Sequence, residues 1–125
     1  MGEHVVARVD EVPDDRGLIV EAGGRELGLF RVGDSFYALR NLCPHQSGPL
    51  GEGGIFPALR ARVVRERIEE YYDRENVVVA CPWHGWEFDL RSGVCLADPG
   101  RRVACYETVV REGRVAVVLP EGDRP

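Results

Sequence analysis

Apolar and polar residues alternate over short stretches of this chain, and turn-forming residues interrupt them every eight to ten positions. β-Branched and aromatic residues are frequent in these stretches, as is typical of strands. Short strands at this spacing predict an all-β fold of antiparallel sheets. The expected strands cover residues 4–9, 17–22, 25–32, 36–40, 76–80, 87–89, 94–96, 103–111 and 114–119. Hairpin turns are expected at residues 23–24, 33–34 and 112–113, because glycine adopts positive φ without strain.

One segment, residues 57–75, shows a different period. Pro57 suits the first position of a helix, and apolar residues then recur at helical spacing, at Val64, Ile68, Tyr71 and Tyr72. The other face would carry charges: Arg60, Arg62, Arg65, Glu66, Arg67, Glu69 and Glu70. The sequence therefore predicts one helical insertion, whose charged face is either solvated or a docking surface. An extended β-hairpin is the alternative, because paired valines and paired tyrosines are weak helix formers.

Length and charge limit the possible functions. The 125 residues suffice for one domain with a hydrophobic core, so a single domain over residues 1–125 is expected. A formal net charge of −5 argues against a nucleic-acid partner. The first residues do not show the basic segment and apolar run of a signal peptide. No apolar run is long enough to span a bilayer, so a cytoplasmic location without a membrane partner is expected.

Candidate chemistry lies in two short stretches, Cys43-Pro44-His45 and Cys81-Pro82-Trp83-His84. The chain has four cysteines and three histidines, so two such pairs are unlikely to arise by chance. The first stretch lies in a segment rich in glycine and proline, which predicts a loop, and loops on rigid β frames often hold functional sites. Thiolates and imidazoles are good ligands for transition metals, and we therefore expect the four side chains to form one metal site.

Zinc and iron both suit a set of two cysteines and two histidines. Structural zinc sites commonly pair one Cys-x₂₋₄-Cys with one His-x₃₋₅-His. Here each stretch instead offers a cysteine followed by a histidine. This order favours a [2Fe-2S] cluster held by two thiolates and two imidazoles.

The two stretches resemble the Cys-x-His and Cys-x-x-His motifs of Rieske iron–sulfur proteins. The flanking residues are similar too: Asn41-Leu42, Gly48-Pro49-Leu50 and Gly85-Trp86-Glu87-Phe88-Asp89-Leu90. Asp98-Pro99-Gly100 resembles the proline-bearing third loop that shields such clusters. The similarity extends from about Val5 to Leu119 and is strongest to the soluble Rieske-type ferredoxins that serve bacterial oxygenases.

This resemblance implies roles for individual residues. Cys43 and Cys81 would bind the inner iron, and His45 and His84 the outer iron near the surface. The residues expected around the cluster are Pro44, Gln46, Ser47, Gly48, Trp83, Gly85, Trp86 and Pro99. Pro44 and Pro82 would stiffen the two loops by fixing φ, the two glycines would let backbone N–H groups approach sulfur, and the two tryptophans would exclude water near the cluster. For Gln46 and Ser47, simple solvation of the loop is an equal alternative. Cys95 and Cys105 are expected to be small buried side chains.

Three departures from the family pattern refine this prediction. High-potential Rieske proteins join their two loops by a disulfide, but Gly48 and Trp83 occupy the matching positions here. Those proteins also place a serine and a tyrosine hydroxyl near sulfur, where this chain has Trp86 and Phe88. Without these hydrogen bonds, a midpoint potential of roughly −150 mV is expected, at the low end of the Rieske range. Finally, 35 residues separate His45 from Cys81, about twice the gap that is usual in small Rieske ferredoxins.

The resemblance implies a one-electron carrier between a flavin-dependent reductase and a terminal oxygenase, of the class that hydroxylates aromatic rings. The chain contains no recognisable nucleophile, acid–base pair or nucleotide-binding loop, so it is not expected to be an enzyme by itself. Two alternatives remain. The protein could be the small Rieske subunit of a larger oxidoreductase such as a nitrite reductase-like complex, or a redox-sensing module.

Overall fold

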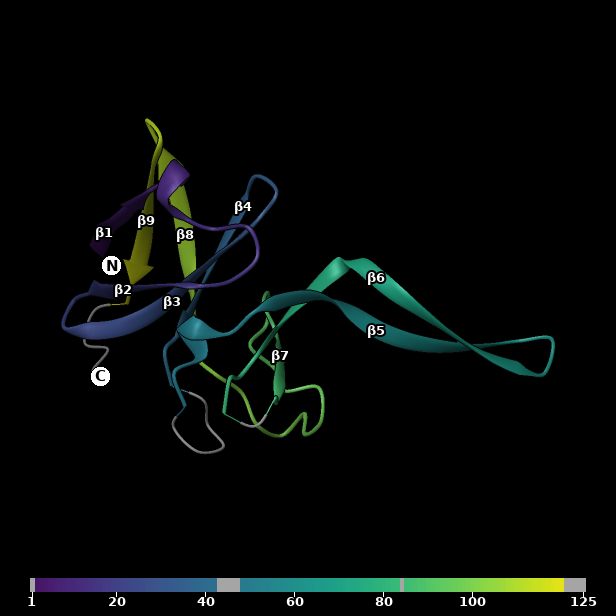
Figure 1. The fold of residues 1–125 in the computed structure, drawn as a ribbon. Coiled ribbons are helices and arrows are strands. Elements are labelled where there is room, and N and C mark those ends of the chain that lie inside the picture. The colour runs from purple at the N-terminus through teal and green to yellow at the C-terminus, as the bar shows by residue number, and fades with distance from the viewer. Residues whose placement is uncertain (1, 43–47, 84, 121–125) are drawn as a thin grey trace.

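The computed structural model describes residues 2–42, 48–83 and 85–120, and these form an antiparallel β structure (Figure 1). The all-β prediction is confirmed. The strands are β1 (Gly2–Arg8), β2 (Leu18–Ala22), β3 (Arg25–Val32), β4 (Ser35–Arg40), β5 (Ile55–Val64), β6 (Arg67–Ala80), β7 (Glu87–Asp89), β8 (Cys105–Arg111) and β9 (Arg114–Leu119). Two short 3₁₀ helices are η1 (Val9–Glu11) and η2 (Leu50–Glu52). The strand expected at 94–96 is reduced to isolated bridges, from Val94 to Arg102 and from Cys95 to Phe88.

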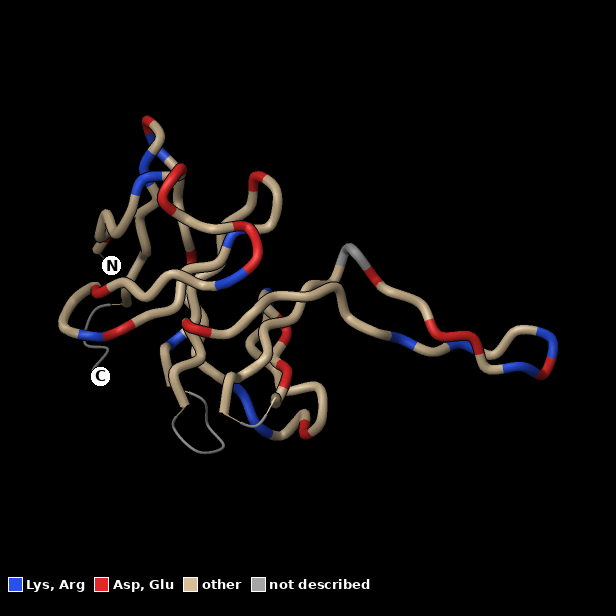
Figure 2. Tube along the Cα trace, in the orientation of Figure 1, with Lys and Arg blue, Asp and Glu red and all other residues tan. Residues whose placement is uncertain are grey.

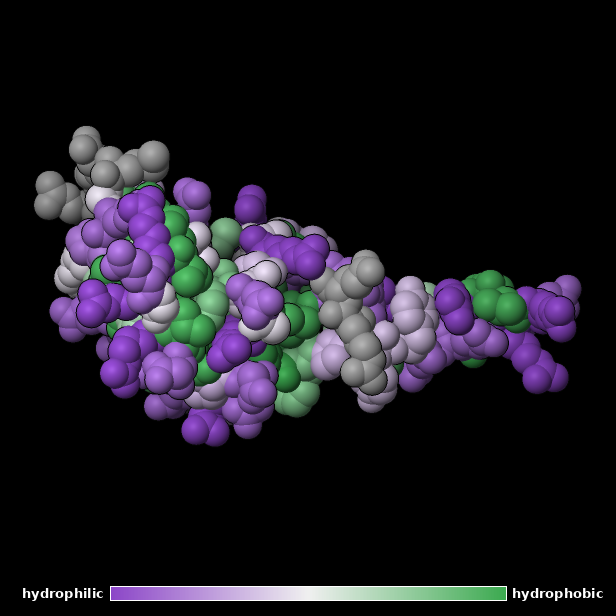
Figure 3. Space-filling view, turned by 90° about the horizontal axis from the view of Figure 1, so that it is seen from above, coloured by the Kyte–Doolittle hydropathy of each residue, from purple (hydrophilic) through white to green (hydrophobic). Residues whose placement is uncertain are grey.

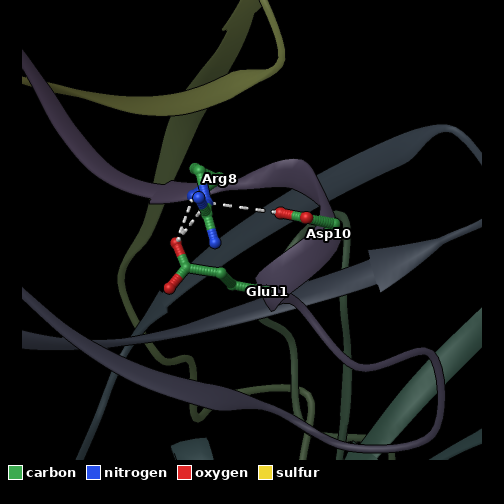
Figure 4. Close-up of polar contacts among 3 residues, drawn as sticks. All are labelled: Arg8, Asp10 and Glu11. Atoms are coloured by element: carbon green, nitrogen blue, oxygen red, sulfur yellow. Dashed lines mark hydrogen bonds and ion pairs between the residues drawn. The ribbon is translucent and has the colours of Figure 1, made fainter.

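The strands form two sheets. Six of them are ordered β1-β9-β8-β4-β3-β2, and the other three are ordered β5-β6-β7. The predicted hairpin turns join neighbours in the larger sheet, and glycines with positive φ occupy them at Gly23, Gly24, Gly33 and Gly113. At η1, the backbone N–H of Arg8 donates to Glu11 Oε1 at 2.7 Å, and Arg8 Nε lies 3.5 Å from Asp10 Oδ1 (Figure 4). These contacts fix the turn that leaves β1.

Alternation along β3 and β4 divides the apolar interior into two cores. Leu27 and Leu29 point into a first core, which they share with residues of β9 such as Val117. Phe30, on the other face of β3, belongs to a second core with Leu39 of β4. This second core also contains Val79, Cys81, Phe88, Leu90, Cys95 and Val103, so it joins the larger sheet to the smaller one. A cysteine expected to bind metal therefore lies at the edge of a core that both sheets build.

The helix predicted over residues 57–75 is wrong. The segment belongs to β5 and β6, which pair in antiparallel register from Ile55↔Val79 to Val64↔Arg67. Valine and tyrosine pairs favour strands, and here that preference outweighs the helical spacing of the apolar residues. Arg65 and Glu66 make the turn with φ of 50° and 65°. Pro57 lies beside a bulge in an edge strand, a position that tolerates proline.

The outer part of this hairpin projects far from the rest of the molecule (Figure 1). We call residues 58–73 the arm; it comprises the part of β5 and β6 between the bulge and the turn. The strands at its base pack into the second core, through Ile55 of β5 and Val77 and Val79 of β6. Among the described residues, no helix is long and apolar enough to cross a membrane.

Candidate metal centre

Asn41 fixes the two ends of the first loop. Its side chain is buried, and its Oδ1 accepts a hydrogen bond from the backbone N–H of Gly51 at 2.5 Å. Its Nδ2 donates to Glu26 Oε1, and its backbone N–H donates to the carbonyl of Glu26 at 3.1 Å. Residue 41 begins the loop and residue 51 lies near its end, so this one side chain holds both ends against β3.

Glycine at the end of the loop allows backbone to pack directly on backbone. A Cβ atom added to Gly28 of β3 would lie 2.7 Å from Gly51 Cα, which is closer than real Cβ contacts come. Leu50, in the same short helix η2, is fully buried in the second core. Close packing on β3 therefore fixes the position of η2 at the end of the first loop.

The end of the first loop also lies against the strand that leads into the second loop. The N–H of Ala80 donates to the carbonyl of Gly54 at 3.0 Å. A Cβ atom on Gly53 would lie 2.2 Å from the carbonyl oxygen of Ala80. Since Cys81 follows Ala80 directly, these contacts fix one proposed ligand relative to the first loop.

The second loop is a tight turn closed by its own backbone. The N–H of Cys81 donates to the carbonyl of Trp86 at 2.8 Å, and the N–H of Gly85 donates to the carbonyl of Cys81 at 2.8 Å. Gly85 has φ of 72°, a conformation that favours glycine. Its role in the turn is thus conformational, and the approach of backbone N–H groups to sulfur stays a prediction. Cys81 itself is only 3% exposed.

The two loops meet at Gly48. A Cβ atom on Gly48 would lie 2.8 Å from Cys81 Sγ and 3.1 Å from Cγ of the Trp83 indole. Only glycine leaves room for the thiol and the ring together. In disulfide-bearing Rieske proteins the matching two positions are joined covalently, whereas here a glycine and an indole ring are in contact. Trp83 is 56% exposed, so it covers this junction from the solvent side.

A third loop is tied to the second through an arginine. Asp98 Oδ1 accepts the N–H of Gly100 at 3.2 Å, and the Asp98 carboxylate pairs with Arg101 Nε at 3.2 Å. The Arg101 guanidinium lies 5.4 Å from the ring centre of the half-buried Trp86. Pro99 is exposed in this loop. Sequence reasoning found the loop and missed Arg101, because nothing in the linear sequence indicates which of several arginines reaches a ring.

The structure describes part of the predicted site. Cys43, Pro44, His45, Gln46, Ser47 and His84 lie outside the described residues. Gly48, Cys81 and Trp83 lie close together, and Trp86 lies beside the third loop. A buried thiol that forms no disulfide, at the junction of two loops, fits a thiolate ligand of an iron–sulfur cluster.

The remaining cysteines differ from each other. Cys95 is fully buried in the second core, as predicted. Cys105 is exposed at the start of β8, with its Sγ 3.7 Å from the carbonyl of Ser92, so the prediction of a buried side chain there is wrong. Cys105 is the first residue of the alternating β8 and, like Glu107 two residues later, lies on its exposed side.

Comparison with known proteins agrees with this geometry. The model of the Rieske [2Fe-2S] domain matches residues 2–107, so the chain belongs to the Rieske family, whose domain binds a [2Fe-2S] cluster. It is 28% identical over 114 residues to ferredoxin CarAc of Metapseudomonas resinovorans, covering 90% of this chain and 89% of that protein. It is 27% identical over 115 residues to the anthranilate 1,2-dioxygenase ferredoxin subunit of Burkholderia cepacia, covering 91% and 89%.

Solved structures of two kinds share the fold. The ferredoxin of carbazole 1,9a-dioxygenase from Nocardioides aromaticivorans IC177 superposes with a TM-score of 0.72 at 27% identity, covering 94% of this chain and 97% of that one. A similar ferredoxin chain comes from a complex of reduced oxygenase and oxidized ferredoxin in carbazole 1,9a-dioxygenase, with a TM-score of 0.67 at 26% identity and coverage of 92% and 100%. The nitrite reductase small subunit of Erwinia carotovora gives a TM-score of 0.67 at 25% identity, covering 97% and 84%.

Proposed function

We propose that this protein is a one-electron carrier that accepts electrons from a flavin-dependent reductase and passes them to a terminal oxygenase that hydroxylates aromatic rings. The observation that carries the proposal is the buried Cys81 thiol, held against Gly48 at the junction of the two loops, in a chain of the Rieske family. Relatives that cover about nine tenths of the chain are named as ferredoxins of dioxygenase systems, which favours this partner class.

The proposed ligands are Cys43 and Cys81 on the inner iron and His45 and His84 on the outer iron. Burial of Cys81 supports an inner position for its iron. The cluster, when bound, takes up and gives back one electron. The protein supplies position and screening: Asn41 holds the first loop, Trp83 covers the loop junction, and Arg101 holds Trp86 beside the third loop. We treat residues 1–125 as one domain with residues 57–75 inserted between the loops, and place the protein in the cytoplasm.

Metal analysis and site variants test the ligand set. Purified protein should contain two iron atoms and two acid-labile sulfides per chain, with a Rieske-type EPR spectrum after reduction. Cys81→Ser and Cys43→Ser should lose the cluster, whereas Cys105→Ser, which changes an exposed thiol, should retain it. An unchanged spectrum in His45→Cys would remove that residue from the proposed ligand set, and zinc in place of iron would reject the cluster.

The midpoint potential and a reconstitution assay test the carrier role. We expect a potential of roughly −150 mV, because Trp86 and Phe88 offer no hydroxyl to sulfur. A value above about +100 mV would contradict this reasoning. With a reductase, NADH and a ring-hydroxylating oxygenase, substrate oxidation should require this protein, and the Cys81→Ser variant should not support it.

A second candidate is the small subunit of a nitrite reductase-like complex, favoured by the structural similarity to such a subunit. The two candidates predict different binding. A subunit should co-purify with a large subunit in a fixed ratio, whereas a carrier should bind its oxygenase weakly and dissociate as salt is raised.

A further inference from the structure

The arm has two unlike faces. Directly paired residues of an antiparallel ladder point to the same side, so the pairs Leu59↔Tyr72, Ala61↔Glu70 and Val63↔Ile68 share one face. This face is apolar except for Glu70, and it is strongly exposed: Val63 and Ile68 are each 76% exposed. Figure 3 shows apolar atoms gathered towards the far end of the arm, with hydrophilic atoms beyond them.

The opposite face is occupied by interactions within the arm. Arg60 Nε lies 2.8 Å from Asp73 Oδ2, and Arg62 Nε lies 3.4 Å from Glu69 Oε2. The Arg62 guanidinium also lies 4.9 Å from the ring centre of Tyr71. The Arg62–Glu69 pair is exposed and contributes little to stability by itself, whereas Asp73 in the other pair is 20% exposed.

Both long edges of the arm are open. Within the described residues, β7 pairs with β6 only at Val78–Ala80, and the Leu90 N–H donates to the Val77 carbonyl at 3.1 Å, so the outer edge of β6 from residue 67 to 76 has no neighbouring strand. An isolated two-stranded ribbon is marginal in water, and three or more strands with an apolar face are needed for independent stability. An open edge beside exposed apolar residues is a template for another strand.

The charge distribution favours a second copy of this chain as the source of that strand. The arm carries four arginines and four acidic residues and is neutral, so the rest of the molecule carries the whole net charge of −5. Figure 2 shows both signs of charge on the arm, with Lys and Arg colouring along β5 and mainly Asp and Glu colouring along β6. The arms of two copies can therefore pair without bringing a net charge into the contact.

We propose that the outer edges of β6 from two copies pair antiparallel about a two-fold axis at Glu70, forming a four-stranded sheet β5-β6-β6-β5. In this register Arg67 lies opposite Asp73 of the second copy, and Ile68 lies opposite Tyr72. Opposite charges and an aromatic residue beside a β-branched one are both favourable cross-strand pairs. Glu69 lies opposite Tyr71, which is neutral. The only like-charge pair is Glu70 with its own copy at the axis.

Neighbouring registers fit less well. An axis at residue 71 would place Glu69 opposite Asp73, and an axis at residue 69 would place Ile68 opposite Glu70. Pairing along β5 is also unfavourable. With an axis at residue 60, 61 or 62, Arg60 or Arg62 would always lie opposite an arginine of the second copy. In the proposed register the two acidic bodies are held apart, because the six steps from residue 67 to residue 73 rise about 20 Å, roughly two Debye lengths at physiological salt.

Sedimentation equilibrium of the cluster-loaded protein tests the proposal. Wild-type protein should dimerise in a concentration-dependent way. Glu70→Gln should lower the dimer Kd about threefold to tenfold, because it removes the like-charge pair at the axis. Glu69→Gln, which removes the same charge one residue away, should not tighten the dimer. Ile68→Arg should raise the Kd at least tenfold, whereas Val63→Arg, on the same face but on β5 away from the paired edge, should have a much smaller effect.

Hydrogen exchange gives a direct readout of the edge. Amides of residues 67–73 should gain protection as protein concentration rises, and this gain should be absent in Ile68→Arg, whose cluster absorption should be unchanged. A protein that stays monomeric at every concentration, in both wild type and Glu70→Gln, overturns the proposal. If Val63→Arg and Ile68→Arg weakened the dimer equally, the apolar faces of the two arms would be stacked on each other, and edge pairing would be rejected. A monomer in which Ile68→Arg instead slows electron delivery would make the arm a docking surface for a redox partner.

Discussion

The base and the arm of the β5–β6 hairpin are held together by different kinds of contact. At its base, the strands pack into the second core, and Gly53 and Ala80 approach so closely that no Cβ fits between them. Along the arm, the same two strands are held by cross-strand pairs of exposed side chains. The base fixes Cys81 against the first loop, and small displacements there change the site. The arm tolerates displacement, because its apolar side chains are largely exposed and not packed into either core. Close packing is therefore concentrated where the proposed ligand Cys81 is positioned.

Gly53→Ala should produce the largest effect. The added Cβ would lie 2.2 Å from the Ala80 carbonyl oxygen, a backbone atom that cannot move without shifting Cys81. We expect a loss of about 3 kcal/mol in unfolding free energy, at the upper end for overpacking, together with lower iron content. Denaturant unfolding and iron analysis measure both. Gly100→Ala, whose Cβ would meet nothing closer than Asp98 Oδ1 at 3.4 Å, is the control. If Gly53→Ala and Gly100→Ala changed unfolding free energy and iron content equally, the close contact at the base of the hairpin would have no special role.

Asn41→Ala should produce the next largest loss of unfolding free energy. It leaves the Gly51 N–H without its side-chain acceptor and removes the donor to Glu26. Loss of a buried partner costs about 1–3 kcal/mol, and we expect about 2 kcal/mol here. Because the first loop loses its clamp, cluster release to an iron chelator should also be faster. If Asn41→Ala lowered the unfolding free energy but left the rate of cluster release unchanged, Asn41 would stabilise the fold without acting on the metal centre.

Arg101→Gln should have a smaller effect. It removes an exposed cation–π contact with Trp86 and an ion pair with Asp98, worth about 0.5–1 kcal/mol together. The tryptophan environment should become more accessible, which acrylamide quenching of fluorescence can measure. Arg102→Gln, a neighbouring exposed arginine, is the matched control and should leave quenching unchanged.

The sequence was sufficient for the parts of the molecule in which local pattern and tertiary structure agree. Alternation predicted β3 and β4, whose two faces point to two different cores, and β9, whose buried valines point into the first core. The glycine turns were recognisable because positive φ has a clear chemical signature. The short third loop was also found, through its Asp98-Pro99-Gly100 composition.

The arm could not be assigned in the same way. Val64, Ile68, Tyr71 and Tyr72 recur at helical spacing, but in the structure Val64 and Tyr71 lie on one face of a ribbon and Ile68 and Tyr72 on the other. With few neighbours, the arm offers no buried face to decide the period, and residue propensity decides instead. The contacts of Gly48, Gly53 and Arg101 could not be predicted either, because each depends on a segment far away in the sequence.

Removal of the arm should have the smallest effect on the metal centre, and this is the most direct test of the comparison. A variant that joins Ala58 to Asp73 through Asn-Gly keeps the base of the hairpin, and Asn-Gly is a favoured two-residue turn. We expect cluster content and midpoint potential equal to wild type, and unfolding free energy changed by less than about 1 kcal/mol, because the removed side chains are largely exposed. The relevant control is wild-type protein diluted until monomeric, so that loss of dimer contacts is not counted as loss of intrinsic stability. A shift in potential after arm removal would mean that the arm acts on the cluster through the base, and that the two halves of the hairpin are one mechanical unit.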